Sequence, residues 1–116
     1  MIELAAANSN VTRLRRLQRR RAVREAEGCI VVEGVHGVRD ALHAQRVESI
    51  FVRAGDHLTV QSLLDPVDAT IPIYVLDAKT FDGVATTVAP QAALAVVSWQ
   101  PATIDDVAFD RGPAIV

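Results

Sequence analysis

The sequence predicts an α/β fold, namely a three-layer α/β/α sandwich built on a mostly parallel sheet. Half of the 116 residues are hydrophobic but only five are aromatic, so we expect a core of Val, Ile, Leu and Ala, as in a buried sheet covered by helices. Short β-branched runs alternate with stretches of helical periodicity, a pattern typical of parallel strands with helices on both faces. The length is sufficient for one domain with one core.

The first predicted element is a helix from about Val11 to Glu27. Good N-cap residues at 8–10 precede it, and Gly28 is a typical stop signal. Helical periodicity divides its side chains between two faces. The apolar face is predicted to carry Val11, Leu14, Gln18 and Ala22. The opposite face is predicted to carry a stripe of Arg13, Arg16, Arg20 and Arg24.

Strands and helices then alternate along the chain. The predicted strands are 29–33, 49–53, 71–76 and 92–99, which are runs of β-branched or small apolar residues. The predicted helices between them are 35–44, 58–64 and 78–85. After residue 99 the pattern decays. We expect 1–99 to form one domain, 100–116 to be a linker and the first strand residues of a further domain, and the chain to be a fragment.

Charge is distributed unevenly along the chain. Residues 1–24 contain seven arginines and one acidic residue, a net charge of +6, whereas residues 25–116 carry −8. Arginine binds phosphate through a planar pair of donors, so a row of arginines at helical spacing is typical of a surface that follows an RNA backbone. The alternative is a solubilising face, but a run of one sign repels itself without an anionic partner. Arg21 differs, because it lies near the predicted apolar face, where a salt bridge with Glu33 or another acid explains it as well as an RNA contact.

A second candidate RNA site is the turn between the first strand and the following helix, Glu33-Gly34-Val35-His36-Gly37. Glycines allow the backbone to approach a ligand, and the amides of a helix N-terminus favour anions. His36 is suited to stacking on an unpaired base. Gln91, before the last strand, is suited to hydrogen bonding with a base or ribose. The structural alternatives are a tight turn that requires Gly34 and a simple turn at Pro90-Gln91.

Patterns for other chemistry are not evident in the sequence. There is no phosphate-binding loop, dinucleotide fingerprint or serine nucleophile elbow. His36 and His43 share roughly one helical face but lack a third ligand, and Cys29 lacks a cysteine partner, so we predict no metal site. No apolar run is long enough to span a bilayer, and no signal peptide is evident. We therefore expect a cytoplasmic chain without a catalytic group or cofactor site of its own.

Taken in order, the motifs resemble those of a known family. The segments NSNVTRLRRLQRRRAVREAEG, CIVVEGVHGVRDAL, ESIFVRAG and VAPQAALAVV resemble the N-terminal substrate-binding domain of SpoU/TrmH-type RNA 2′-O-ribose methyltransferases over about residues 8–98. The positions that fall on family motifs are Arg16, Arg20, Arg21, Glu33, Gly34 and Gln91. One departure is Ala92, where the family commonly has glycine, and this puts in doubt a close approach of that backbone to RNA.

The resemblance implies a sandwich like that of ribosomal proteins that bind kinked RNA, and a role in gripping ribosomal or transfer RNA. It also implies a second, knotted domain that binds S-adenosylmethionine, forms a homodimer and transfers the methyl group, so the present chain alone is expected to be inactive. The predicted RNA-binding residues are Arg13, Arg16, Arg20, Arg21, Arg24, Glu33, Gly34, His36 and Gln91. Rival interpretations are a stand-alone RNA-binding protein, a small α/β enzyme or nucleotide-sensing domain, and a domain whose basic helix binds an acidic protein.

Overall fold

The computed structural model describes residues 1–86 and 92–99. Five strands form one sheet in the order β1-β4-β3-β5-β2. The strands are β1 (Ile2–Glu3), β2 (Cys29–Glu33), β3 (Val47–Arg53), β4 (Ile73–Leu76) and β5 (Ala93–Ser98). Strand β4 pairs in parallel with β1 and β3, whereas β5 lies between β3 and β2 and is antiparallel to both. Four strands therefore run in one direction and β5 in the other.

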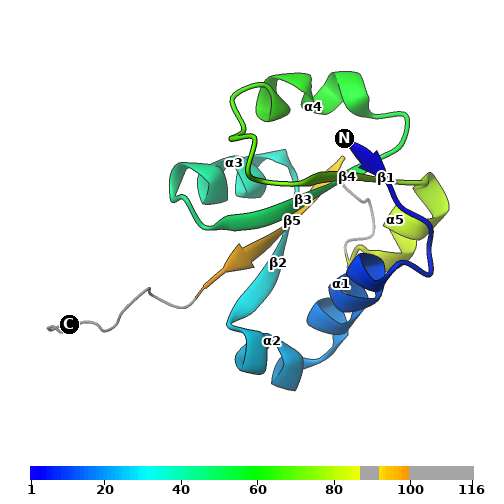
Figure 1. The fold of residues 1–116 in the computed structure, drawn as a ribbon, viewed down its shortest axis with the longest axis vertical. Helices are drawn as coiled ribbons and strands as arrows, with labels where there is room; N and C mark the ends of the chain where they lie inside the picture. Colours follow the sequence, from blue (N-terminus) through cyan, green and yellow to red (C-terminus); the bar gives the residue numbers. More distant parts are fainter. Residues whose placement is uncertain (87–91, 100–116) are drawn as a thin grey trace, which may run out of the picture.

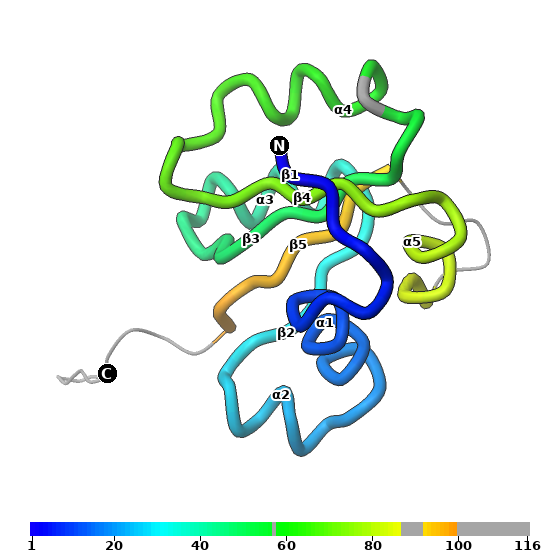
Figure 2. The backbone as a smooth tube through the Cα atoms, turned by 45° about the vertical axis from the view of Figure 1, so that its right-hand side comes forward, coloured from blue at the N-terminus to red at the C-terminus, as the bar shows by residue number. Residues whose placement is uncertain are grey.

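Helices cover both faces of this sheet (Figure 1). The helices are α1 (Ser9–Arg19), α2 (Arg21–Glu27), α3 (Val35–His43), α4 (His57–Leu64) and α5 (Ala78–Val84). One core cluster joins the sheet to α1 and α5, and a second cluster joins its other face to α3 and α4. Figure 2 shows α3 and α4 above the sheet and α1 with α2 below it. The predicted α/β/α sandwich with a mostly parallel sheet is confirmed.

The central strand β3 supplies side chains to both cores. Ile50 and Val52 belong to the cluster under α3 and α4, whereas Phe51 belongs to the cluster under α1 and α5. This is the two-residue alternation that the pleat of a strand imposes. All three side chains are at most 1% exposed, so the β-branched and aromatic run at this position is a strand because both of its faces are buried.

The single helix predicted over 11–27 is in fact two helices. Arg20, between them, has an extended backbone with φ −122° and ψ 109°. The Arg24 guanidinium donates hydrogen bonds to the carbonyl oxygens of Leu17 (2.8 Å) and Gln18 (3.4 Å), which lie in the last turn of α1, where carbonyls lack helical partners. No glycine or proline marks this break in the sequence. The end of α1 is stabilised by the Arg24 side chain, which comes from the next helix.

Two glycines shape the connection from β2 to α3. Gly34 has φ 96° and ψ 153°, a region that only glycine adopts readily. Its N–H donates to the carbonyl oxygen of Ala93 at 2.9 Å, which keeps the turn in register with β5. A Cβ placed on Gly37 would lie 2.6 Å from Cγ1 of Val32. Gly37 therefore lets α3 pack against the sheet at a distance that a side chain would prevent.

The remaining differences from prediction are small. Sequence reasoning does not predict β1, because its two residues are too few to show a periodicity. The predicted strand 49–53 begins two residues earlier, at Val47, and the predicted strand 71–76 begins at Ile73. Within residues 1–86 and 92–99, none of the helices is long and apolar enough to cross a membrane.

Candidate nucleic-acid interface

The Glu33 carboxylate, at the end of β2, is the centre of a hydrogen-bond network. It accepts hydrogen bonds from the side-chain amide of Gln18 in α1 (3.0 Å) and from the backbone N–H (3.1 Å) and hydroxyl of Thr86. The Gln18 amide also donates to the carbonyl oxygen of Val84, the last residue of α5 (3.2 Å). The ends of α1, β2 and α5 therefore meet at one edge of the sheet. We call this the carboxyl edge, because β2, β3 and β4 end there.

The connection from α1 to α2 brings positive charge to the carboxyl edge. We call its three cations, which directly follow Gln18, the turn arginines: Arg19, Arg20 and Arg21. The first two are exposed and make no ion pair with any residue in the described part of the chain. The third is 84% exposed and pairs with Glu25 at 2.9 Å, so its predicted position near the apolar face is wrong. The turn arginines begin one residue after Gln18, whose side chain is bound to Glu33 at the end of β2.

Arg13 lies toward the other end of α1 and is held by two carboxylates. Its guanidinium contacts Glu27 at 2.7 Å and Glu48 at 2.8 Å, and it also approaches the Cys29 sulfur at 3.8 Å. Although burial opposes the charge, the hydrogen bonds that Arg13 donates to Glu27 and Glu48 raise the pKa of Arg13 above its ordinary value. These partners lie near the starts of β2 and β3. Arg13 therefore stabilises the edge of the sheet opposite the carboxyl edge.

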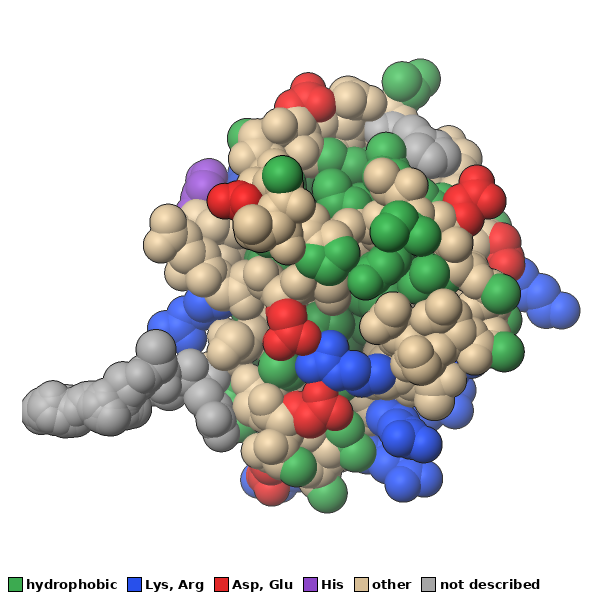
Figure 3. Space-filling view, viewed as in Figure 1, with side chains coloured by type: hydrophobic (Ala, Val, Ile, Leu, Met, Phe, Trp, Pro, Cys, Tyr) green, Lys and Arg blue, Asp and Glu red, His purple; other side chains and the backbone are tan. Residues whose placement is uncertain are grey.

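The predicted stripe of four arginines along one helix is wrong as a continuous surface. Arg24 is on a separate helix and caps the carbonyl groups at the end of α1, and Arg13 is bound by glutamates. Arg16 is exposed and lines a small hollow at the start of α1, whereas Arg20 belongs to the turn. Figure 3 shows Lys and Arg side chains gathered beside α1 and α2 on this side of the molecule. The basic end of the sequence is thus a cluster around a turn.

The β2–α3 turn adds backbone donors to the carboxyl edge. Gly34 is the N-cap of α3 and provides no side-chain acceptor for the first amides of the helix. These amides have no partners within a helix, and they carry partial positive charge. His36 is exposed in the first turn of α3. Of the predicted residues in this turn, His36 is exposed, whereas Gly34 is buried and its N–H donates to Ala93 in β5.

Arg53, at the end of β3, also lies at the carboxyl edge but is occupied. Its Nε and Nη2 atoms contact both carboxylate oxygens of Asp82 in α5 (2.9 and 3.1 Å), and Nη1 lies 3.7 Å from Asp56. The bond with Asp82 raises the pKa of Arg53, and the same bond lowers the pKa of Asp82. Arg53 therefore braces α5 against the sheet and is not free to bind phosphate.

Sequence reasoning places some of this site and misses the rest. Gln91, a predicted contact, lies outside the described residues. The sequence predicts Gln18 on the apolar face of its helix. A polar side chain on such a face requires a buried hydrogen-bond partner, so this position indicates a bond like the one with Glu33. Thr86 gave no signal. The Glu33 carboxylate holds α1 and the residue after α5, and its contact with RNA stays a prediction.

Comparison with known proteins identifies the family of the chain. A family model described as the MRM3-like substrate binding domain matches residues 8–95. No curated protein matches the sequence. The match to the family model covers the basic turn, the Glu33 network and most of the sheet.

Solved structures share the fold. An RNA 2′-O ribose methyltransferase superposes with a TM-score of 0.65 at 18% identity, covering 91% of this chain and 40% of that chain. The SpoU methyltransferase AviRb from Streptomyces viridochromogenes, in complex with the cofactor AdoMet, gives 0.67 at 18%, covering 84% and 36%. A putative RNA methyltransferase of the TrmH family from Porphyromonas gingivalis gives 0.64 at 24%, covering 84% and 37%. The chain therefore spans about two fifths of the length of the solved structures that it matches.

The described residues offer neither a metal-ligand cluster nor a glycine cradle at the start of α3. They contain no group of three or more His, Cys, Asp and Glu side chains arranged to hold a metal ion. The glycines at the start of α3 do not form a cradle for S-adenosylmethionine, because the space beside Gly37 is filled by Val32 of the core.

Proposed function

Because the chain belongs to the MRM3-like substrate binding domain family, we propose that it binds the RNA substrate of an S-adenosylmethionine-dependent RNA 2′-O-ribose methyltransferase. The observation that carries the proposal is the hydrogen bond between Gln18 and Glu33. This bond joins the residue before the turn arginines to the residue before the glycine turn that begins α3. Arginine side chains and helix N-terminal amides are both groups that bind the phosphates of nucleic acids.

In this proposal the domain positions RNA and performs no chemistry. The turn arginines and Arg16 contact phosphates, which supplies affinity and fixes the register of the RNA. Gly34 is buried and sets the path of the turn, and the exposed His36 stacks on an unpaired base. Arg13, Arg24 and Glu33 maintain the shape of this surface.

Methyl transfer belongs to another part of the enzyme in this proposal. S-adenosylmethionine supplies the methyl group when it is bound there, since the described residues do not fit it. The substrate is a structured ribosomal or transfer RNA, the setting is the cytoplasm, and the enzyme is a homodimer joined through its catalytic part. Support for this division comes from the solved methyltransferases, in which the matched region is about two fifths of the chain.

The test is a salt series of binding to fluorescent fragments of ribosomal RNA. The variant replaces Arg16, Arg19 and Arg20 with Ala, and a charge-matched control replaces Arg15, Arg46 and Lys79 with Ala. We expect affinity to fall steeply with salt for the wild type. The slope of log K against log salt should decrease by roughly two to three for the variant, because each lost phosphate contact removes about 0.7 to 0.9. Circular dichroism verifies the fold of each protein.

Two results would overturn this function. One is a wild-type chain that binds no RNA at low salt. The other is an equal loss of affinity in the variant and the charge-matched control, which would show that net charge and not the turn is responsible. Binding to polyglutamate with the same salt dependence would favour an acidic protein partner in place of RNA.

A further inference from the structure

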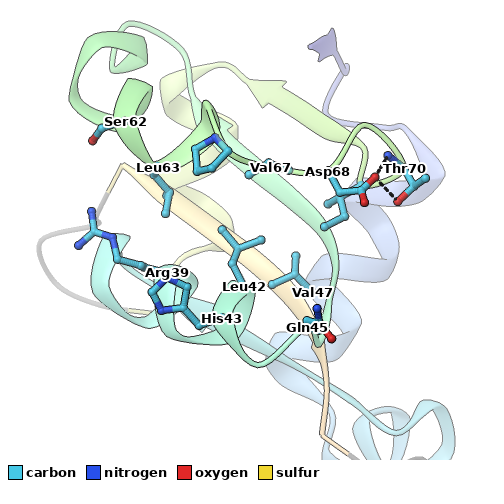
Figure 4. Close-up of a pocket in the computed structure, with 12 residues that line it drawn as sticks. Arg39, Leu42, His43, Gln45, Val47, Ser62, Leu63, Val67, Asp68 and Thr70 are labelled. Carbon is cyan, nitrogen blue, oxygen red and sulfur yellow. Dashed lines mark hydrogen bonds between the residues drawn. The ribbon is translucent and has the colours of Figure 1, made fainter.

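A hollow of about 540 Å³ lies between α3 and the segment that connects α4 to β4 (Figure 4). It is on the face of the sheet opposite α1. Leu42 and Val47 point into it from below in this view, and Leu63 and Val67 point into it from above. Leu63 is buried and the other three are half-buried. The floor of the hollow is therefore an apolar surface that is not filled by the fold itself.

The rim of the hollow is polar, and its charge is uneven. Arg39 and His43 lie at one end, on α3, whereas Gln45, Asp68 and Thr70 lie at the other end (Figure 4). The Asp68 carboxylate accepts hydrogen bonds from the backbone N–H (2.8 Å) and hydroxyl (2.9 Å) of Thr70, and these bonds hold the pKa of Asp68 below its ordinary range. Because one end is anionic, an anionic group of a ligand fits only beside α3.

Gln45 has an unusual backbone for its residue type. Its φ is 58°, a left-handed conformation that glycine adopts without steric cost. It follows the end of α3 in a Schellman motif, in which the Gln45 N–H donates to Leu42 (3.0 Å) and the Arg46 N–H donates to Ala41 (3.2 Å). Glycine is the usual residue at this position. A glutamine held there places a side-chain amide at the rim of a cavity, and unfavourable backbone of this kind is characteristic of binding sites.

One side of α3 runs from the β2–α3 turn to the hollow. His36, Arg39 and His43 recur at three- and four-residue spacing, so they share one side of α3, where Asp40 is also exposed. The distance along the helix from His36 to His43 is about 10 Å, which corresponds to roughly three nucleotides of a stacked strand. An RNA strand held at the β2–α3 turn therefore reaches the hollow along this side of α3.

We propose that the hollow binds one unpaired nucleotide of the RNA, with its base on the apolar floor and its phosphate beside Arg39 and His43. An extruded base packs against apolar side chains and exposes its edge to hydrogen-bonding groups. The Gln45 amide and the Asp68 carboxylate are hydrogen-bonding groups at the opposite end of the rim from Arg39. This inference rests on the proposed function and deepens it, because it names the feature of the RNA that the domain recognises.

The test compares two RNA duplexes that are identical except for one unpaired, bulged nucleotide. We expect the wild-type chain to bind the bulged duplex at least about tenfold more tightly in fluorescence anisotropy titrations, the size of a typical base-packing contribution. Val67→Trp fills the hollow, and Arg39→Ala removes the cation without altering the core. Each should reduce binding of the bulged duplex to that of the paired duplex. Lys79→Ala, which removes an exposed cation elsewhere, should keep the tenfold difference.

The outcomes separate this inference from the proposed function. Equal binding of the two duplexes by the wild type would overturn the nucleotide site. It would leave the phosphate contacts of the turn arginines in place, and the hollow would then be assigned to a protein contact. A bulge preference that persists in folded Val67→Trp and in Arg39→Ala would also overturn the nucleotide site, because another surface would then bind the bulged nucleotide. No binding to either duplex would overturn the proposed function and this inference with it.

Discussion

The side-chain amide of Gln18 donates a 3.0 Å hydrogen bond to the carboxylate of Glu33, and so joins the last turn of α1 to the last residue of β2. The turn arginines follow Gln18 in the chain, and the glycine turn follows Glu33. The two parts of the proposed phosphate site are therefore positioned by a contact that does not itself involve RNA.

Replacing Glu33 by Ala should lower both stability and RNA affinity. We expect the free energy of unfolding to fall by about 1 to 3 kcal/mol, because the donors of Gln18 and Thr86 lose their acceptor. Affinity for RNA should fall without a change in the salt slope, since no phosphate contact is removed. Urea unfolding and salt-dependent binding measure the two effects. Glu3→Ala, which removes an exposed acid that makes no ion pair with another described residue, is the control, and tighter RNA binding by Glu33→Ala would contradict a positioning role.

Arg13 should matter for stability and not for RNA binding. Arg13→Ala removes two ion pairs, with Glu27 and Glu48, and should lower the free energy of unfolding by roughly 1 kcal/mol, the scale of partly exposed pairs. A double-mutant cycle with Glu48→Ala isolates the coupling of that pair. The salt slope of RNA binding should equal that of the wild type. A salt slope reduced by about one would instead indicate that Arg13 contacts a phosphate of the RNA.

The layers of the fold could be predicted from sequence because burial leaves a periodic pattern. Ile50, Phe51 and Val52 alternate between two cores, and a run of this kind identifies a strand without knowledge of its neighbours. The break at Arg20 could not be predicted, since the group that ends α1 is the side chain of Arg24 on the next helix. The residues next to Arg20 do not indicate this contact, because it forms only when α2 folds back toward the end of α1.

The candidate RNA-binding residues also divide into those that the sequence identifies and those that only the folded structure identifies. Gly34 was identifiable from sequence, because a strand-to-helix turn requires a backbone that glycine adopts. The arginines were identifiable as a charged group but not as individuals. Which of them are free depends on Glu27 and Glu48, which approach Arg13 only in the folded chain. Composition therefore predicts an anionic partner, and tertiary contacts decide which cations remain available to it.

Acid should destabilise the fold only at low pH. The backbone N–H and hydroxyl of Thr80 hold the pKa of Asp77 below its ordinary value, and the bond from Arg53 does the same for Asp82. A carboxyl group with a lowered pKa in the folded state contributes stability above its unfolded pKa, near 4. That contribution is lost as pH falls through this value toward the folded pKa.

Urea unfolding at pH 7, 5 and 3 tests this expectation. Stability from these two groups should be unchanged between pH 7 and 5 and should decrease at pH 3. Asp77→Asn keeps an acceptor for the Thr80 N–H at the start of α5 but cannot titrate, so its loss between pH 5 and 3 should be smaller. An equal loss in the variant would assign the acid sensitivity to other groups.

Replacing Gln45 by Gly should raise the free energy of unfolding and weaken the preference for a bulged RNA duplex. Glycine adopts the φ of 58° at this position without steric cost, so the free energy of unfolding should rise by up to about 1 kcal/mol. The amide at the rim of the hollow is lost, so the preference for a bulged over a paired duplex should decrease. Ala44→Gly is the matched control, because Ala44 has an ordinary helical backbone with φ −79°. Glycine there should lower stability by roughly 0.5 to 1 kcal/mol and leave the bulge preference intact. If Gln45→Gly gains stability and keeps the full preference, the glutamine amide has no part in recognising the nucleotide. A combined gain in stability and loss of discrimination would show that the unfavourable backbone is retained for binding.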